Sequence, residues 1–470
     1  MFYCREGELH QMNRRYDKNK FECVVIYGRR RVGKTALINE FCKEKPTIYF
    51  SALNASSLEN LEALSKAIYS YKNPDESANA PTYRNYDDAL EAITAMSREQ
   101  RLVFVIDEYP YLAKAEKSIS SRLQHIIDHM WQESQLYLIL CGSSMSFMEY
   151  QVLGYESPLY GRRTAQFKIH ALTYKEMTVF HPTLSPEDQA LLYGITSGVP
   201  HYINKLDVED NLDDALLENL FNPSSYLFEE PENLLKQELR EPAIYNSIIS
   251  AIAGGSTRAN EIATKVGLES SVCSKYLKVL LDLGILKRET PITEKPGKKT
   301  IYTIDDNFFR FWYRFVPRNM SAISAGRIEQ IYTKAVKRYF SDYMGLVFEK
   351  MCRDYLLRYA DSLPILLSEV GQWWGTDSKE RKEVQIDIVG TPVDGNEYII
   401  GSCKYKNEKI GVDELELIRH YASVFGRGNK YHYFIFSKVG FSSALEALGK
   451  QGEVTLLTLE DIYIYKNVNG

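Results

Sequence analysis

A glycine-rich loop near the start of the chain constrains the fold more than any other feature. Residues 28–35 read Gly-Arg-Arg-Arg-Val-Gly-Lys-Thr and fit the pattern G-x-x-x-x-G-K-[ST], with an apolar strand before them and a helical stretch at 36–42 after them. In this arrangement the glycines let backbone N–H groups turn inward towards phosphate oxygens, and the helix N-terminus adds a positive dipole. The sequence therefore predicts an α/β domain that binds a nucleoside triphosphate.

The loop residues have individual expected roles. Lys34 is expected to reach the β- and γ-phosphates, and the hydroxyl of Thr35 is expected to reach Mg²⁺. ATP and Mg²⁺ are the expected cofactors, although no motif in the sequence distinguishes ATP from GTP. The residues predicted to surround the nucleotide are Gly28, Arg29, Arg30, Arg31, Val32, Gly33, Lys34 and Thr35.

The composition excludes several classes of protein. A chain of 470 residues with 44% hydrophobic and 25% charged residues is typical of a soluble protein of about three domains. Seven cysteines without a C-x-x-C pair argue against a disulfide framework and against a zinc site. The N-terminus does not have the build of a signal peptide, and no apolar run approaches the ~18 residues of a membrane span. We therefore expect a cytoplasmic, reduced protein that does not contact a membrane.

Two acidic residues follow the apolar run at 102–106. A buried parallel strand forms such a continuous run, and ligands gather at its carboxyl end. Asp107 is expected to hold the Mg²⁺ shell, and Glu108 is expected to orient and deprotonate the attacking water. The alternative is that both are ordinary polar residues at a strand end.

Further candidates follow the next strand, at 136–142. Ser143 or Ser144 is expected to contact the γ-phosphate or the water, unless they form a plain strand-to-loop turn. Arg162 and Arg163, just before the strand at 167–170, are candidates to neutralise charge on the γ-phosphoryl group in their own subunit or in a neighbour's. Action in a neighbour would require a homo-oligomer. Surface ion pairs are the alternative role for these arginines.

An ordered set of motifs carries a resemblance to a known family. The set resembles the archaeal-type ATPase family, a branch of the P-loop ATPases related to the AAA+ and STAND groups, over about residues 2–235. The resemblance implies a core at 1–171, in which the strand before Glu108 lies beside the strand before Ser143. It also implies a helical lid at 172–235, in which Gly198 and Pro200 shape the contact with nucleotide. The motifs are at residues 5–9, 28–35, 107–110, 158–163 and 198–202.

A basic module is predicted at 236–330. Residues 236–320 carry 14 Lys and Arg against 9 Asp and Glu, a net charge of +5 in a chain whose total is −5. Three short helices and a hairpin with a Pro/Gly turn indicate a winged helix-turn-helix. In its DNA-binding mode the third helix enters the major groove and the wing contacts phosphates, whereas a solvated surface or a protein-docking role is the alternative. The candidate contacts with double-stranded DNA are Lys275, Lys278, Lys298 and Lys299.

The segment 335–470 is predicted to form a separate α/β domain. Its expected order is a helix, two strands, a helix and a strand, at 335–359, 383–389, 398–405, 412–425 and 431–437. With Glu349, Asp387 and Lys404 in this order, it resembles the PD-(D/E)xK nuclease-like fold. Trp373-Trp374 strengthens a resemblance to the uncharacterised domain that often follows this type of ATPase.

The nuclease-like pattern is broken at one position. Ser402 stands two residues before Lys404, where the pattern has an acid, and a hydroxyl is a poor substitute for a carboxylate at a metal. Glu383, or Glu414 or Glu416 on the following helix, is a candidate to compensate. We expect a degenerate site that does not cleave, and an active nuclease is the alternative.

Together these features predict an ATP-hydrolysing switch. Its nucleotide state would reposition the winged helix and the nuclease-like domain on DNA or on a partner. The alternatives are a nuclease gated by ATP, an ATP-binding DNA-binding regulator with little turnover, and a protein scaffold without nucleic-acid contact.

Overall fold

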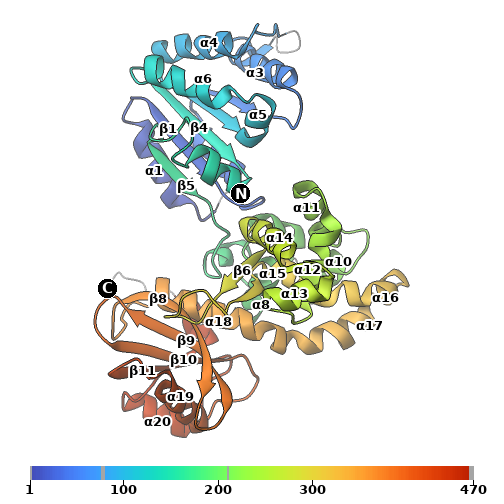
Figure 1. The fold of residues 1–470 in the computed structure, drawn as a ribbon, viewed down its shortest axis with the longest axis vertical. Helices are drawn as coiled ribbons and strands as arrows, with labels where there is room; N and C mark the ends of the chain where they lie inside the picture. The colour runs from blue at the N-terminus through green and yellow to red at the C-terminus, as the bar shows by residue number, and fades with distance from the viewer. Residues whose placement is uncertain (1–2, 76–79, 209–210, 465–470) are drawn as a thin grey trace. The chain divides into compact units, whose positions relative to one another are not determined.

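The computed structural model describes residues 3–75, 80–208 and 211–464 (Figure 1). Residues 1–2 and 76–79 of the predicted core, 209–210 of the predicted lid and 465–470 of the predicted C-terminal domain lie outside the described residues. The chain forms two compact units. The first comprises Met1–Leu172 and Val199–His201, and the second comprises Thr173–Gly198 and Tyr202–Gly470.

The first unit is built on a five-stranded sheet in the order β2-β3-β4-β1-β5, in which every pair is parallel. The strand before Glu108 therefore lies beside the strand before Ser143, as the resemblance implies. The elements are α1 (Glu6–Tyr16), β1 (Glu22–Tyr27), α2 (Lys34–Cys42), β2 (Thr47–Ser51), α3 (Ser57–Lys72), α4 (Tyr86–Glu99), β3 (Leu102–Asp107), α5 (Tyr109–Ala115), α6 (Ile119–Ile126), a π-helical turn (Ile127–Trp131), β4 (Leu136–Gly142), α7 (Met145–Phe147), a second π-helical turn (Met148–Val152) and β5 (Ala165–Lys168).

Apolar layers cover both faces of this sheet. Along β1, Val24 and Ile26 pack with Leu37 and Phe41 of α2, whereas Val25 belongs to the core on the other face, which α3, α4 and α6 cover. Since alternate residues of a strand point to opposite faces, burial on both sides explains why the central strands are continuous apolar runs. The polar residues are thereby left at the strand ends.

Gly28 directly follows β1, at a point where its backbone passes very close to the segment after β5. Its φ is +154°, and a Cβ placed there would lie 2.2 Å from the carbonyl oxygen of Ile169, so that no other residue fits without a shift of the backbone. Gly33, at the entrance to α2, has a φ of +96°, which is also strained for residues with a side chain. The two glycines are therefore required by the shape of the loop itself.

The second unit begins with short helices in the segment predicted as the lid. They continue directly into three helices and a two-stranded antiparallel sheet in the predicted winged-helix segment. The elements are a 3₁₀ turn (Glu176–Phe180), α8 (Pro186–Thr196), α9 (Pro200–Leu206), α10 (Leu212–Leu220), α11 (Glu230–Glu238), α12 (Pro242–Ala253), α13 (Ala259–Val266), α14 (Ser270–Asp282), β6 (Leu286–Glu289), β7 (Ile301–Ile304), α15 (Asn307–Phe315), α16 (Met320–Ser324) and α17 (Ile328–Ile331).

The C-terminal part of this unit is a mixed sheet in the order β12-β11-β10-β9-β8. Strands β8, β9 and β10 are antiparallel neighbours, whereas β10, β11 and β12 are parallel. The elements are α18 (Phe340–Arg358), preceded by a π-helical turn (Tyr332–Val336) and two 3₁₀ turns (Pro317–Asn319 and Lys337–Tyr339), β8 (Leu367–Asp377), β9 (Lys382–Pro392), β10 (Glu397–Lys404), α19 (Val412–Phe425), β11 (Lys430–Ser437), α20 (Ser443–Lys450), β12 (Thr455–Thr458) and α21 (Leu459–Tyr463).

The predicted order of this domain was incomplete. Both Trp373 and Trp374 lie inside β8, an eleven-residue strand that the sequence analysis did not recognise, and α20, β12 and α21 were also missed. In β8 only Trp373 and Asp377 are buried, so the strand lacks the apolar alternation that marks a strand in sequence. No helix in the described parts of the chain combines the length and apolar character of a membrane span.

Candidate functional site

Lys34 lies inside the glycine-rich loop. Its Nζ donates to the carbonyl oxygens of Gly28 and Arg29, both at 2.9 Å. Burial lowers the pKa of Lys34 below its usual value, although Cys141, Glu108 and Asp107 act in the opposite direction. An anion stabilises a buried ammonium group more than neutral carbonyl oxygens do, so the loop is suited to bind phosphate.

Asp107 and Thr35 come together at the carboxyl end of the sheet. Oγ1 of Thr35 lies 3.3 Å from Oδ2 of Asp107, and Asp107 is 7% exposed. Tyr49 of β2 donates its hydroxyl to the same oxygen at 2.7 Å. A hydroxyl and a carboxylate are ligands that Mg²⁺ prefers, so this pair fits the expected ion.

Glu108 occupies a strained position one residue further on. Its φ is +51°, in the left-handed region that residues with a side chain rarely adopt. Oε2 of Glu108 accepts hydrogen bonds from the hydroxyl of Ser143 at 3.0 Å and from its N–H at 3.3 Å. The structure thus brings Glu108 and Ser143 together, whereas Ser144 is placed only at the start of α7. Strain of this kind concentrates at functional sites.

The two candidate arginines have partners within the first unit. Arg162 forms a two-pronged ion pair with Asp128, with Nη2–Oδ2 at 2.7 Å and Nε–Oδ1 at 3.0 Å. This contact raises the pKa of Arg162 and lowers the pKa of Asp128. Arg163 donates to the carbonyl of Leu153 at 3.3 Å. The contact of Arg162 matches the ion-pair alternative, whereas Arg163 contacts a backbone carbonyl, and a catalytic role of either arginine stays a prediction.

Two supporting residues, Arg5 and Tyr49, had no predicted role in the sequence analysis, and Arg30 was predicted only to lie beside the nucleotide. Arg5 donates from Nη2 to the carbonyl of Val32 at 3.3 Å and also contacts the carbonyl of His170, so it connects the loop to the segment after β5. Arg30 donates to the hydroxyl of Tyr111 at 2.7 Å, and Tyr49 orients Asp107 as described above. Arg5 lies in a motif that carried the resemblance, but single residues distant in sequence give no signal of such contacts.

The predicted nuclease-like residues also lie close together. Oγ of Ser402 donates to Oε1 of Glu414 at 2.7 Å and lies 3.4 Å from Oδ2 of Asp387, which also accepts the N–H of Cys403 at 3.0 Å. Nζ of Lys404 lies 3.2 Å from the same Oε1 of Glu414. Among the three candidates to compensate for Ser402, Glu414 is therefore the one that reaches the site, whereas Glu383 and Glu416 are exposed.

Glu349 of α18 completes this cluster from another side. It is 9% exposed, and Oε2 contacts Nε2 of Gln372 and lies 3.9 Å from Nη1 of Arg353. Burial, together with the charge of Asp387, raises the pKa of Glu349 to about 7. Burial also raises the pKa of Asp387, although Lys404 opposes this shift. Both carboxyl groups therefore hold their protons more tightly than an exposed carboxyl group does, because burial disfavours the charged form.

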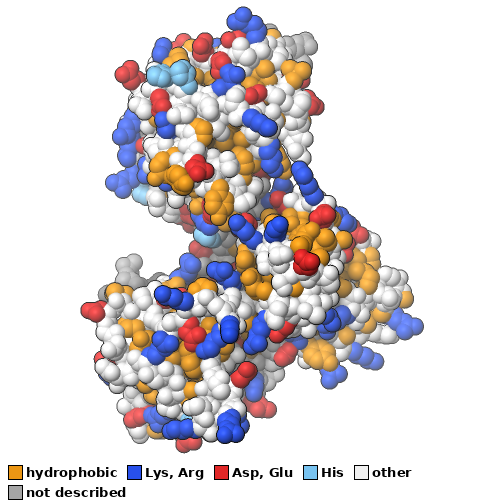
Figure 2. Space-filling model, viewed as in Figure 1, with side chains coloured by type: hydrophobic (Ala, Val, Ile, Leu, Met, Phe, Trp, Pro, Cys, Tyr) orange, Lys and Arg blue, Asp and Glu red, His pale blue; other side chains and the backbone are white. Residues whose placement is uncertain are grey.

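The predicted DNA-contacting lysines fall into two groups. Lys275 and Lys278 are exposed on α14, and Lys298 is exposed in the β6–β7 loop, whereas Lys299 pairs with Glu294 at 2.8 Å. Many Lys and Arg side chains, with acidic ones among them, lie over the region of β6, β7 and β8 (Figure 2).

The β6–β7 loop is docked on the C-terminal sheet. Ile292 donates its N–H to the carbonyl of Gln372 at 2.8 Å, and its side chain belongs to the core that contains Trp373. The loop is thus held at one end.

Comparisons with known proteins agree with this architecture. Residues 2–206 match a family described as an ATPase domain predominantly from Archaea, and residues 312–415 match a family of archaeal and bacterial proteins of unknown function. The first unit has the P-loop ATPase fold. Its fold is shared with the Walker-type ATPase of Pyrococcus abyssi, which has a TM-score of 0.52 and 18% identity over 67% of this chain and 96% of that one.

Relatives in sequence define the family. An uncharacterised protein of Methanocaldococcus jannaschii is 32% identical over 412 residues, which cover 87% of this chain and 88% of the relative. An uncharacterised ATP-binding protein of the same organism is 47% identical over 45 residues, 10% of this chain and 76% of that protein. The chain belongs to the archaeal-type ATPase family, with the domain of unknown function at its C-terminal side. This confirms the resemblance inferred from the ordered motifs.

Proposed function

We propose that this chain hydrolyses ATP and uses the reaction as a molecular switch. The observation that carries the proposal is the convergence of Lys34, Thr35, Asp107 and Glu108 at the carboxyl ends of β1 and β3. Mg²⁺, held by Thr35 and Asp107, would neutralise charge on the β- and γ-phosphates. Lys34 binds the same phosphates, which fixes the γ-phosphoryl group relative to the strand end.

Glu108 is the group that acts on the attacking water. Its carboxylate accepts the water proton as the water approaches the phosphorus, and the two hydrogen bonds from Ser143 keep the carboxylate in one orientation. A wrongly oriented base slows hydrolysis without weakening nucleotide binding. Ser143, which holds the carboxylate of Glu108, is therefore a positioning residue in this scheme.

The experiment is the measurement of Mg²⁺-dependent phosphate release from ATP by the full chain. Thr35→Val removes the hydroxyl at the metal and should greatly reduce release at every Mg²⁺ concentration. Thr47→Val is the matched control, since that hydroxyl donates to the carbonyl of Lys45 in the same unit and should be dispensable. Equal rates in both variants would contradict the proposal.

The second unit offers a way to transmit the nucleotide state. The hydroxyl of Tyr343 in α18 lies 2.6 Å from the carbonyl of Gly194 in α8 and 2.9 Å from that of Asn307 in α15. Nε1 of Trp312 donates to the carbonyl of Phe228 at 2.6 Å, and a stacked aromatic pair adds to the same core. We infer that the lid segment, α15 and α18 move together, because a displacement of one would break buried contacts of the others.

We further propose that helices α12–α14 and strands β6–β7 act as a winged helix-turn-helix that contacts double-stranded DNA through α14. The exposed Lys275 and Lys278 support this role. The docked β6–β7 loop makes α14 the better candidate than Lys298 and Lys299 at the wing.

A salt titration tests the DNA contact. Lys275→Ala with Lys278→Ala should weaken DNA binding and lower the slope of log affinity against log salt by about 0.9 for each phosphate that the protein no longer neutralises. Lys66→Ala with Lys72→Ala on the exposed face of α3 removes the same charge elsewhere and serves as the control. Unchanged binding in the α14 variant would favour a protein-docking role.

We propose that the nuclease-like cluster of Glu349, Asp387, Ser402 and Lys404 does not cleave DNA. Glu414 supplies an anion near Ser402, but the same oxygen neutralises Lys404 and accepts the Ser402 hydroxyl, which leaves it poorly placed to bind a metal ion. Incubation of plasmid DNA with the full chain and Mg²⁺ should show no cutting. Cutting that is lost in Asp387→Ala would favour the ATP-gated nuclease instead.

A further inference from the structure

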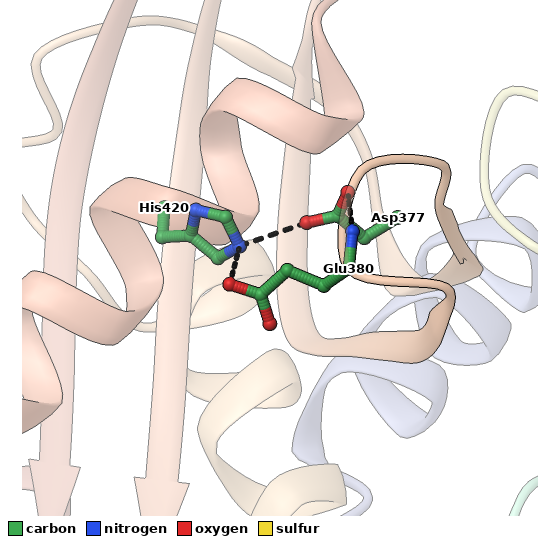
Figure 3. A group of neighbouring side chains, drawn as sticks. All are labelled: Asp377, Glu380 and His420. Carbon is green, nitrogen blue, oxygen red and sulfur yellow. Dashed lines mark hydrogen bonds and ion pairs between the residues drawn. The ribbon is translucent and has the colours of Figure 1, made fainter.

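Asp377, Glu380 and His420 form a second cluster of side chains in the C-terminal sheet domain. Asp377 is the last residue of β8, Glu380 lies in the turn between β8 and β9, and His420 projects from α19 (Figure 3). One ligand atom from each residue lies within 4.8 Å of the other two. This cluster is distinct from the one around Asp387.

Asp377 carries the unusual feature of this cluster. The residue is 4% exposed, and Oδ1 accepts the backbone N–H groups of Lys379 at 2.8 Å and Glu380 at 3.2 Å. Oδ2 is shielded from solvent, and it pairs with Nε2 of His420 at 3.0 Å. This oxygen and this nitrogen are therefore held beside each other, and both are donor atoms that a metal ion can bind.

The spacing of the three ligand atoms fits a small tetrahedral ion. Nε2 of His420 lies 3.0 Å from Oδ2 of Asp377 and 4.0 Å from Oε1 of Glu380, and both oxygens face the same nitrogen in Figure 3. Ligands about 2.0–2.2 Å from Zn²⁺ in tetrahedral geometry lie roughly 3.3 Å apart, a value between these two distances. Small side-chain adjustments would therefore bring all three atoms into the coordination shell.

The donor set selects the class of metal. An imidazole nitrogen with two carboxylate oxygens suits Zn²⁺ and related transition metals better than Mg²⁺ or Ca²⁺, which prefer oxygen ligands alone. The absence of C-x-x-C pairs argues only against a cysteine-based zinc site. We propose that Asp377, Glu380 and His420 bind Zn²⁺ and that the ion clamps the β8–β9 turn to α19.

The clamp would act on a defined part of the fold. Within the part of the chain that the structure describes, the contacts of the turn other than those with His420 are local, as in the Lys382–Glu380 ion pair at 3.6 Å. One ion bound by both segments would add a bond between elements that are 40 positions apart in sequence, and such a bond stabilises only the folded state. Three protein ligands leave one coordination position for water.

The test measures Zn²⁺ binding by the full chain after treatment with a chelator, in the absence of nucleotide. We expect saturable binding and a higher melting temperature with Zn²⁺. His420→Gln should weaken Zn²⁺ binding by roughly a hundredfold or more, because loss of a residue that only hydrogen-bonds to a metal ligand already lowers metal affinity about 10–100-fold. Co²⁺ in place of Zn²⁺ should give the visible absorption of a tetrahedral site, and this signal should be lost in the variant.

His432→Gln is the matched control. Nε2 of His432 lies 2.7 Å from Oε2 of Glu397, so the control breaks a histidine–carboxylate pair in the same domain. Glu380→Gln offers a second test variant, because Glu380 is exposed and its loss should not disturb folding. Zn²⁺ binding and stabilisation that persist unchanged in His420→Gln and Glu380→Gln, or no saturable binding by the unaltered chain, would overturn the proposal.

Discussion

Lys34 begins the helix that follows the glycine-rich loop of the first sheet, whereas Lys404 ends a strand of the C-terminal sheet. Their partners show how a site that can take an anionic ligand differs from one whose charges are already paired. Lys34 contacts the neutral carbonyls of Gly28 and Arg29, and burial lowers its pKa. Burial acts on Lys404 as well, but Asp387 and Glu414 outweigh it and raise the pKa of Lys404. A lysine that donates its hydrogen bonds only to neutral carbonyls is stabilised when an anionic ligand replaces them. A lysine that is already paired with carboxylates is stabilised little by a further anion.

The largest effect should come from exchanging the first lysine. Lys34→Ala should weaken ATP binding by roughly a hundredfold or more, about 3 kcal/mol, because it removes charge-assisted hydrogen bonds to two phosphates. Lys404→Ala removes the same charge at the other sheet and should leave ATP affinity unchanged. Titration of a fluorescent ATP analogue into both variants measures the two affinities, and similar affinities would contradict the different roles assigned to Lys34 and Lys404.

A carboxylate introduced at position 402 tests whether the cluster around Lys404 lacks only a metal ligand. Ser402→Glu places another anion beside Asp387 and Glu414, so we expect the free energy of unfolding to fall by about 3 kcal/mol without metal. Mn²⁺ should then bind and restore much of this loss, since hard cations take carboxylate ligands. Ser402→Gln has the same size without the charge and should not respond to Mn²⁺. Equal responses of the two variants in thermal melts would contradict the prediction.

Glu349 gives the cluster a pH dependence with a definite sign. Its pKa is about 7 in the folded chain, against an ordinary value of 4.5, so the folded state retains the proton that the unfolded state releases. The free energy of unfolding should therefore fall as pH rises from about 4.5 to about 7. The variant Glu349→Gln should show a flatter pH dependence in this range, and at pH 8 its free energy of unfolding should exceed that of the unaltered chain by on the order of 2 kcal/mol. Urea unfolding at pH 5 and pH 8 checks the difference, and identical pH dependence in both proteins would refute the assignment.

The smallest effect concerns the orientation of Glu108. Ser143→Ala removes the 3.0 Å hydrogen bond to the carboxylate and should slow phosphate release about tenfold, equivalent to about 1.4 kcal/mol, without a change in ATP affinity. Ser144→Ala tests the neighbouring serine and should have little effect. A slower rate in Ser144→Ala than in Ser143→Ala would reverse the assignment.

The sequence predicted those features that depend on local pattern. The glycine loop, the apolar strands and the acidic pair at 107–108 each occupy a few consecutive residues, so the parallel sheet, the P-loop fold and the family were predicted and confirmed. The site roles stay predictions, although the structure brings Thr35, Asp107 and Glu108 together.

The features that were missed depend on contacts between distant residues. Strand β8 has few buried positions, so it shows no alternation, and the hydrogen bond from Tyr49 to Asp107 joins two strands. Glu414 was one of three candidates near Ser402, and only the packing of α19 on the sheet distinguishes it from Glu383 and Glu416. Asp377 and His420 are far apart in sequence and belong to no recognisable spacing.

The most direct test of the central claim is a paired measurement of ATP binding and phosphate release in Glu108→Gln. The account predicts ATP affinity close to that of the unaltered chain and phosphate release reduced by about a hundredfold or more, because the amide cannot accept the water proton. Glu133→Gln, an exposed exchange in the same unit, should match the unaltered chain in both assays. Phosphate release at the unaltered rate in Glu108→Gln would contradict the account.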